Sequence, residues 1–407
     1  MKKREVAPPI RSGVSQQNTK HINSMLIFDA VRKSGKAARV KISEMTGLST
    51  STVSELVDGL ITDGLLVEYG NEVNQSRGRN PILLSINPEG GYTIVIEVIN
   101  TGYNCYLCNL LCEIVGTSFY RVSEGKKHCV GEIIEGLLGA NGIKNESVLG
   151  ICIDYPGICD RRGRSMLYSI VVDNEDYLNN EDIDLLAERF PNAAMMVNND
   201  SSIAAYASFR VSGPHISEVV IYLNMFECVG AGAILSNGQG EDIYEFPIEI
   251  GQLLMPAGDE SQAGELETFE KRTNALEIFK KINNQTDIRL DYTDEYLTEK
   301  NFDCMKTIGD ELAKGNTEVE SVISDIAKDI AIALSNIRNT IQPSDVFVGG
   351  MVKNLGEKFV EMIEKEISLI PSLPYDGKMN IHLSGIDNST KIVGAANMLM
   401  DSVFALV

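Results

Sequence analysis

The chain has 407 residues, 43% of them apolar, and its 57 acidic and 36 basic residues give a net charge of −21 at pH 7. No stretch is long and apolar enough to cross a bilayer, and the basic start at Lys2, Lys3 and Arg4 is not followed by the apolar core of a signal peptide. These features argue against a membrane-spanning protein and predict a soluble, cytoplasmic chain of two or three domains.

The charge is unevenly distributed along the chain. Residues 1–90 hold 12 basic and 9 acidic residues, so residues 91–407 carry a net charge of −24. The basic residues nearest the first clear motif are Arg32, Lys33, Lys36, Arg39 and Lys41. We expect this basic segment to meet nucleic-acid phosphates, while the acidic remainder is repelled from them.

Residues 42–69 have the pattern of two short amphipathic helices joined by a turn at Gly47, with Ser49 as the N-cap of the second helix. An upstream apolar stripe from Asn23 to Val31 predicts a third helix that covers the pair. We expect Ile42 and Met45 to pack against the second helix. The pattern is typical of a winged helix-turn-helix, although a generic helical hairpin remains an alternative. The predicted DNA contacts are Lys41, Ser49, Thr50, Ser51, Thr52 and Ser54.

The segment after the predicted wing contains Arg77-Gly78-Arg79, followed closely by Pro81. Two arginines around a glycine form a narrow, cationic finger that fits the minor groove of A·T-rich DNA. A solvated linker is the alternative interpretation. We count Arg77 and Arg79 among the predicted DNA contacts.

From Gly91 onwards, strands and turns predominate. Two apolar runs at 92–99 and 103–111 form a hairpin signal around Asn100-Thr101-Gly102, and runs at 219–223 and 229–235 repeat it. Helical patterns at 130–138, 183–189, 201–210 and 322–341 supply covering layers, so we predict two related α/β halves with a ligand site between them. Cys105 and Cys108 would point to opposite faces of one strand, which favours buried cysteines over a metal cluster with Cys112.

The order of motifs resembles the ROK family of repressors and sugar kinases, in the branch that regulates sugar catabolism. After the helix-turn-helix, wing and Gly78-Arg-x-Pro81 come the strand hairpin and four further motifs. They are Gly150-Ile-Cys-Ile-Asp-Tyr-Pro-Gly-Ile-Cys-Asp160, Val197-Asn-Asn-Asp200, Glu249-Ile-Gly-Gln252 and Val346-Phe-Val-Gly-Gly350. The resemblance covers nearly the whole chain and implies a duplicated actin-like, ribonuclease-H-like fold for residues 91–407.

The resemblance also shows what this sequence lacks. At the family's first phosphate hairpin it has Glu97, Ile99, Asn100 and Thr101 without the two glycines, and at the second phosphate turn it has Phe226, Glu227 and Cys228. A side chain at Ile99 blocks close backbone approach to a phosphate, and Glu227 would repel one. The family's zinc ligands are missing from the segment 258–267 and from Gln252. We therefore expect no ATP, no metal and no other cofactor.

The family's sugar-contacting positions are better preserved. The resemblance assigns sugar contacts to Asn199, Asp200, Glu249 and Gln252, with Asp200 at the position of the kinases' general base. Together these side chains supply both donors and acceptors for sugar hydroxyls. Asp200 could instead, or in addition, cap the helix that follows it.

We therefore expect a winged helix-turn-helix domain with an Arg-Gly-Arg linker at residues 1–80 and a catalytically inactive, two-lobed sugar-kinase-like sensor at residues 91–407. The predicted function is sugar-responsive transcriptional regulation, most simply repression of a carbohydrate-utilisation operon, by a homodimer or dimer of dimers on a palindromic, A·T-rich site in double-stranded DNA. No membrane partner is expected. Two alternatives remain: a bifunctional ATP-dependent sugar kinase that uses Asp200 as base, and a ligand-independent DNA-binding protein with a vestigial pocket.

Overall fold

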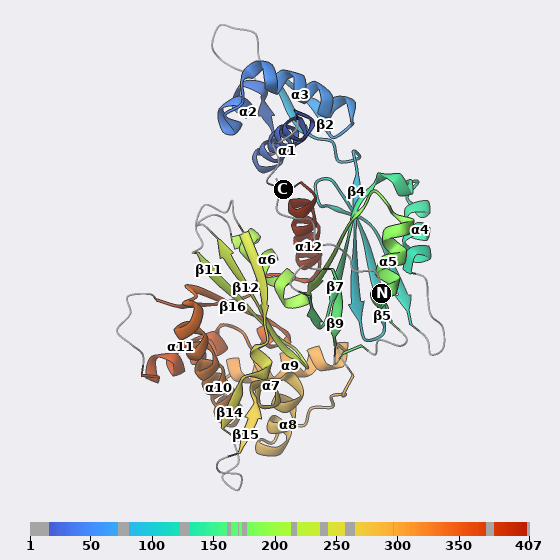
Figure 1. Cartoon of the computed structure of the whole chain (residues 1–407). Coiled ribbons are helices and arrows are strands. Elements are labelled where there is room, and N and C mark those ends of the chain that lie inside the picture. The colour runs from blue at the N-terminus through green and yellow to red at the C-terminus, as the bar shows by residue number, and fades with distance from the viewer. Residues whose placement is uncertain are drawn as a thin grey trace.

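The computed structural model describes residues 16–71, 81–122, 130–160, 164–169, 171–172, 177–212, 218–236, 243–256, 265–295, 297–371 and 378–404. These residues form a small N-terminal head and two α/β lobes (Figure 1). Within these ranges, none of the helices combines the length and the apolar content that crossing a bilayer requires.

The head packs three helices with a small antiparallel sheet in the strand order β1-β3-β2. Its elements are α1 (Gln16–Ser34), β1 (Ala37–Ala38), α2 (Arg39–Thr46), α3 (Thr50–Thr62), β2 (Leu66–Asn71) and β3 (Ile82–Ile86). Gly47 ends α2 in the left-handed conformation, with φ of 70°. Ser49 Oγ accepts a hydrogen bond from Thr52 N at 3.2 Å and so begins α3. The two helices and their turn therefore lie where the sequence predicts them.

Apolar side chains from all three helices fill the head. Ile27, Val31, Ile42 and Val53 are fully buried in one cluster. The predicted packing of Met45 against α3 is wrong, because 45% of this residue is exposed. Ile42 alone supplies the main apolar contact from α2, a short helix with few positions facing the core.

A short connection fastens the head to the rest of the chain. Asn87 follows β3, and its Nδ2 donates to Gly64 O at 2.7 Å. Leu110 N, in the first lobe, donates to Pro88 O at 3.2 Å. Strand β3 follows the expected boundary at residue 80 and lies in the head sheet, so the head extends to the connection itself.

The two lobes contain sheets of the same design. Each has an antiparallel three-strand meander followed by two parallel strands, in the orders β6-β5-β4-β7-β10 and β13-β12-β11-β16-β17. The first sheet comprises β4 (Tyr92–Ile99), β5 (Gly102–Asn109), β6 (Ile114–Arg121), β7 (Val148–Tyr155) and β10 (Ala194–Asn199). The second comprises β11 (Val219–Met225), β12 (Val229–Ser236), β13 (Ile243–Ile248), β16 (Asp345–Gly350) and β17 (Asn380–Leu383). Both predicted hairpins are present, and the repeated strand order agrees with two related halves.

Helices and short strands complete the lobes. The first lobe has α4 (Val130–Ala140), η1 (Asn145–Ser147), β8 (Ile158–Cys159), β9 (Met166–Tyr168) and α5 (Asn180–Arg189). The second has η2 (Ile250–Gln252), β14 (Leu254–Pro256), β15 (Leu266–Thr268), α7 (Phe269–Thr273), α8 (Ala275–Gln285), α9 (Glu299–Ala313), α10 (Thr317–Ile341), η4 (Met351–Leu355) and α11 (Glu357–Leu369). Cys105 and Cys108 belong to different apolar clusters on the two faces of the first sheet, as predicted.

Two further helices cross between the lobes. Helix α6 (Asp200–Ser212) follows the last strand of the first sheet and packs on β11 and β12 of the second. Helix α12 (Asn388–Val403) follows the last strand of the second sheet and packs on β4 and β7 of the first. The two helices also contact each other (Figure 1). One apolar cluster contains side chains of both helices, of the head and of both sheets.

Gly232 in β12 provides a test of how α6 is positioned. A Cβ atom at Gly232 would lie 2.3 Å from Ser201 O in the α6 backbone, which cannot rotate away. Gly232→Ala should therefore lower the free energy of unfolding by about 1–3 kcal/mol. Gly136→Ala, on the exposed face of α4 where no atom lies within 4 Å of the added carbon, should raise it by about 0.5–1 kcal/mol. Urea denaturation measures both, and equal behaviour of the two variants would contradict the close approach.

Candidate functional site

The candidate ligand site lies at the carboxyl ends of three parallel strands of the first sheet. Glu97 of β4 and Asp154 of β7 are register partners, and β10 ends at Asn199, next to Asp200. Because neighbouring parallel strands end at the same edge of a sheet, these side chains come together although they are far apart in the sequence.

Lys391 from the first turns of α12 enters this group of acids. Its Nζ lies 2.8 Å from Glu97 Oε1 and 2.8 Å from Asp154 Oδ2. Exposed fractions are 9% for the Glu97 side chain, 1% for Asp154 and 19% for Lys391. We call Glu97, Asp154, Asp200 and Lys391 the acid cluster.

Burial and the attraction between Lys391 and the acids shift the pKa values in the acid cluster by different amounts. Burial would lower the pKa of Lys391, but Asp154, Glu97 and Asp200 raise it well above its usual value, so the side chain is a cation. Burial would raise the pKa of Glu97, yet Lys391 and amide donors lower it to about 2. Burial raises the pKa of Asp154 to about 6, with Lys391 opposing the change. Asp154 is therefore the carboxylate that is held least firmly in its charged form.

Asp200 and Asn199 have different roles at the start of α6. Asn199 caps the helix, since its Oδ1 accepts from Ser201 N at 2.9 Å, and its Nδ2 donates to Gly157 O at 2.8 Å. Asp200 Oδ1 accepts from the same Ser201 N–H at 2.8 Å, so Asp200 also contributes to the cap, as the sequence allowed. Asp200 Oδ2 accepts from Asn224 Nδ2 at 3.1 Å, across from the second sheet, and burial raises its pKa. Asp200 is therefore placed where the two sheets meet.

Glu249 and Gln252 flank one turn of the second lobe. Burial raises the pKa of Glu249, and the charges of Asp200 and Glu270 add to the effect, so Glu249 lies within the field of Asp200. Gln252 is exposed on η2, and its N–H donates to Glu249 O at 3.1 Å. The charge of Asp200 thus reaches Glu249, and Gln252 lies on the same turn as Glu249.

The two turns that the family uses for phosphate are differently organised. Glu227 is 3% exposed, and its Oε1 accepts from Leu297 N at 3.1 Å and Asn301 Nδ2 at 3.0 Å. The Glu227 carboxyl group is directed at the start of α9 and is engaged there. The β4–β5 turn at Ile99, Asn100 and Thr101 borders a cavity of about 420 Å³ that Glu295 and Arg121 also line.

The segment expected to replace the zinc element lies largely outside the described residues. Beside it, Arg272 binds Asp329 through both oxygens at 2.9 and 2.8 Å and also pairs with Glu267 at 3.0 Å. These bonds hold the β14–β15 hairpin against α10. Across the described ranges, no three His, Cys, Asp or Glu side chains are arranged to hold a metal ion.

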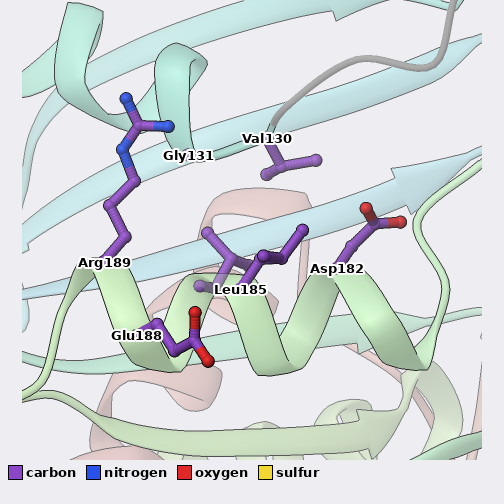
Figure 2. A pocket seen from close by; sticks show the side chains of 7 residues that line it. Val130, Gly131, Asp182, Leu185, Glu188 and Arg189 are labelled. Atoms are coloured by element: carbon purple, nitrogen blue, oxygen red, sulfur yellow. The ribbon is translucent and has the colours of Figure 1, made fainter.

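A second cavity, of about 330 Å³, lies between α4 and α5 (Figure 2). It is lined by Val130, Gly131, Asp182, Leu185, Leu186, Glu188 and Arg189. None of the residues predicted to contact a ligand borders it.

The predicted DNA contacts are mainly at the surface of the head. Ser49, Thr50 and Ser51 are exposed at the start of α3, while Thr52 and Ser54 are partly buried. Lys41 is exposed and pairs with Glu44 at 3.2 Å. Arg77 and Arg79 lie outside the described residues.

One expectation for the basic segment is wrong. Arg32 does not face solvent with the other basic residues: its side chain is 13% exposed and pairs with Asp29 and with Asp401 of α12. Helix α1 turns this position towards the two lobes, so Arg32 binds the protein's own carboxylates instead of phosphates.

Sequence reasoning missed Asp154, Asn224 and Lys391 as site residues. A signal existed for Asp154, because an acid that interrupts the apolar strand 148–155 must have a partner. Nothing in the local sequence of α12 distinguishes Lys391 from a surface lysine, because only the tertiary fold brings it to Glu97.

Lys391 should be the most sensitive charge in the acid cluster. Lys391→Met leaves buried carboxylates without their cation and should lower the free energy of unfolding by about 3–5 kcal/mol in urea denaturation. Adding Asp154→Asn should restore part of the loss, because it removes one orphaned charge. Lys358→Met, which breaks a half-exposed pair with Glu320, should cost about 0–1 kcal/mol. A loss as small for Lys391 as for Lys358 would refute this assignment.

Comparison with known proteins gives relatives that match the chain from end to end. No model of a known protein family matches it. The xylose repressor of Caldicellulosiruptor bescii is 23% identical over 397 residues, which cover 95% of this chain and 97% of that protein. The DNA-binding transcriptional dual regulator NagC of Escherichia coli is 20% identical over 386 residues, covering 92% and 91%.

Solved structures share the fold. A ROK family transcriptional regulator, a homologue of the Escherichia coli MLC protein, matches with a TM-score of 0.74 at 18% identity, over 96% of this chain and 98% of its own. A ROK family glucokinase from Streptomyces griseus, in complex with glucose and AMPPNP, matches with a TM-score of 0.55 at 17% identity, over 76% of this chain and 99% of its own. The two lobes thus have the actin-like sugar-kinase fold of ROK proteins. The resemblance found in the motifs is confirmed, and the chain is a relative of the ROK-family repressors over nearly its whole length.

Proposed function

We propose that the chain is a DNA-binding transcriptional repressor of carbohydrate utilisation whose lobes sense a sugar. One observation carries the proposal: relatives named as a xylose repressor and as a DNA-binding transcriptional regulator match more than nine-tenths of the chain, too large a share to omit the head. The glucokinase structure, by contrast, matches 76% of the chain with 99% of its own length. The unmatched share is close to the size of the head and its connection, which supports the head as the regulatory addition.

The proposed DNA-binding domain is a winged helix-turn-helix at residues 1–80, completed by β3. The exposed hydroxyls of Ser49, Thr50 and Ser51 at the start of α3 would contact bases in the major groove, with Thr52 and Ser54 behind them. The Nζ atom of Lys36 lies over the ring of Tyr69 in β2, 3.3 Å from its centroid, which would place a cation at the wing. Lys41 pairs with exposed Glu44, and phosphate can compete for such a surface pair.

Arg77 and Arg79 remain proposed minor-groove contacts. A dimer, or a dimer of dimers, bound to a palindromic, A·T-rich site would place one head on each half-site.

The proposed sensor comprises residues 91–407, with Asp200 and Glu249 as hydroxyl acceptors and Asn199 and Gln252 beside them. Lys391 is the one cation of the acid cluster, against Glu97, Asp154 and Asp200, and Glu249 adds a further acid. A phosphate group would be repelled there, whereas sugar hydroxyls can donate to carboxylates. We therefore propose an unphosphorylated sugar as the effector.

We further propose that the lobes do not transfer phosphate. Three observations support this: Ile99 lies in the first turn, Glu227 in the second, and Lys391 is held between Glu97 and Asp154. Phosphoryl transfer depends on positioned positive charge around the phosphates. Here the first turn has a side chain at Ile99 in place of a glycine, and the second turn carries Glu227 in place of a cation.

DNA binding should depend on the start of α3. Binding sites would be selected from random duplexes with the full chain, and affinity measured by fluorescence anisotropy. Thr50→Ala with Ser51→Ala should weaken binding to the selected site at least about tenfold, the value of a lost base contact. Thr62→Ala, at the other end of the same helix, should leave affinity unchanged. Equal affinity of all three proteins would exclude α3 as the reading helix.

Sugar binding should depend on Asp200, whereas DNA binding should not require this residue. In thermal-shift titrations, an unphosphorylated sugar from a panel including D-xylose, D-glucose and N-acetyl-D-glucosamine should stabilise the chain, and the matching sugar phosphates should not. Asp200→Asn should weaken binding of the active sugar about tenfold or more, while exposed Asp325→Asn should not. Both variants should still bind the selected DNA. Stabilisation by a sugar phosphate alone would contradict the proposed effector class.

A further inference from the structure

Asp401, near the end of α12, is shared between the head and α6. Its Oδ1 accepts from Arg32 of α1, and its Oδ2 accepts from Arg210 and Tyr206 of α6. The Arg32 side chain is 13% exposed and that of Asp401 is 30% exposed, so solvent screens this pair less than the surface pairs of the head. One carboxylate therefore joins three helices.

Neighbouring contacts hold this junction in place. Arg32 also donates to Asp29 at 3.0 Å and to Asn397 of α12 at 3.4 Å. The rings of Phe28 and Phe404 stack with centroids 4.3 Å apart, beside the end of α12 that approaches α1 (Figure 1). The head thus meets the lobes through α1 and not through the exposed start of α3.

The opposite ends of α6 and α12 reach the acid cluster. Helix α6 begins with Asp200, and α12 carries Lys391 in its first turns. Each of these residues is about ten positions, or about 15 Å of helix, from Arg210 and Asp401 respectively. Between the two ends the helices touch, since a Cβ at Gly394 would lie 2.6 Å from Ala207 Cβ.

We propose that Asp401 couples the acid cluster to the head. A helix moves as a rigid rod, so a displacement of α6 or α12 at Asp200 or Lys391 also displaces Arg210 or Asp401. One oxygen of Asp401 binds donors of α6 and the other binds Arg32 of α1. Such a displacement therefore changes the bond between Asp401 and Arg32, and with it the orientation of the head. This inference rests on the proposed function and adds a route by which the lobes regulate the head. The route can be tested in the chain without DNA or sugar.

A static strut is the competing interpretation. A strut would stabilise the head without linking it to the acid cluster, so a substitution at Asp200 would not change amide exchange in α1. A coupling residue makes changes at the two ends non-additive, and that difference can be measured.

The test is hydrogen–deuterium exchange of the α1 amides in the full chain, without DNA or sugar. Asp200→Asn perturbs the acid cluster and should change α1 exchange by about fivefold or more in the parental chain. In an Arg32→Gln background the same substitution should change it by less than about twofold. Lys33→Gln is the matched control: Lys33 is the next residue of α1 and pairs with Asp29 at 2.8 Å but not with Asp401, so the coupling should persist.

A second background tests whether Arg32→Gln acts only by loosening the head. Arg210→Gln combined with Tyr206→Phe keeps the Arg32–Asp401 pair and removes both α6 donors to Asp401, so this double variant should abolish the coupling as Arg32→Gln does. The proposal is overturned if Asp200→Asn leaves parental α1 exchange unchanged, or changes it equally in the background of the double variant. These results do not depend on ligand or operator. A chain that binds neither selected DNA nor any sugar would refute the proposed function separately.

Discussion

The ammonium group of Lys391 ties α12 to two strands, β4 and β7, which lie more than two hundred residues earlier in the chain. Without that cation, Glu97 and Asp154 would be adjacent buried carboxylates, an arrangement that proteins avoid because desolvation and repulsion act together. With it, α12 is fixed in position and orientation against the first sheet. The contact with α6 and the approach to the head follow from this placement, because both lie further along the same helix.

Much of the fold could be predicted from local sequence, since its signals are local. The cap at Ser49, the left-handed Gly47 and the apolar periods of the strands each arise from a few neighbouring residues. The exchange of α6 and α12 between the lobes could not be predicted in this way. An amphipathic pattern shows that a helix packs on something, but it does not identify the sheet that it covers.

The candidate site, too, could be predicted only in part from the sequence. Asp200 and Glu249 could be proposed from motif order, and the structure brings them into one electrostatic environment. Arg32 was interpreted from its neighbours as a phosphate contact, yet its partner Asp401 lies 369 positions away. Sequence proximity to Lys33 and Lys36 gave a misleading signal, because adjacent residues of a helix point in different directions. Charge composition alone cannot separate a residue that meets DNA from one that meets the protein's own acids.

The exchanged helices also have a consequence for synthesis on the ribosome. A chain emerges from its N-terminus, and the first lobe needs α12, which follows nearly all the rest of the sequence. Until then, the faces of β4 and β7 that α12 covers remain open to water, and Arg32 of the head lacks its bond to Asp401. The long sequence separation of these contacts predicts slow completion of the fold and a reliance on chaperones during translation.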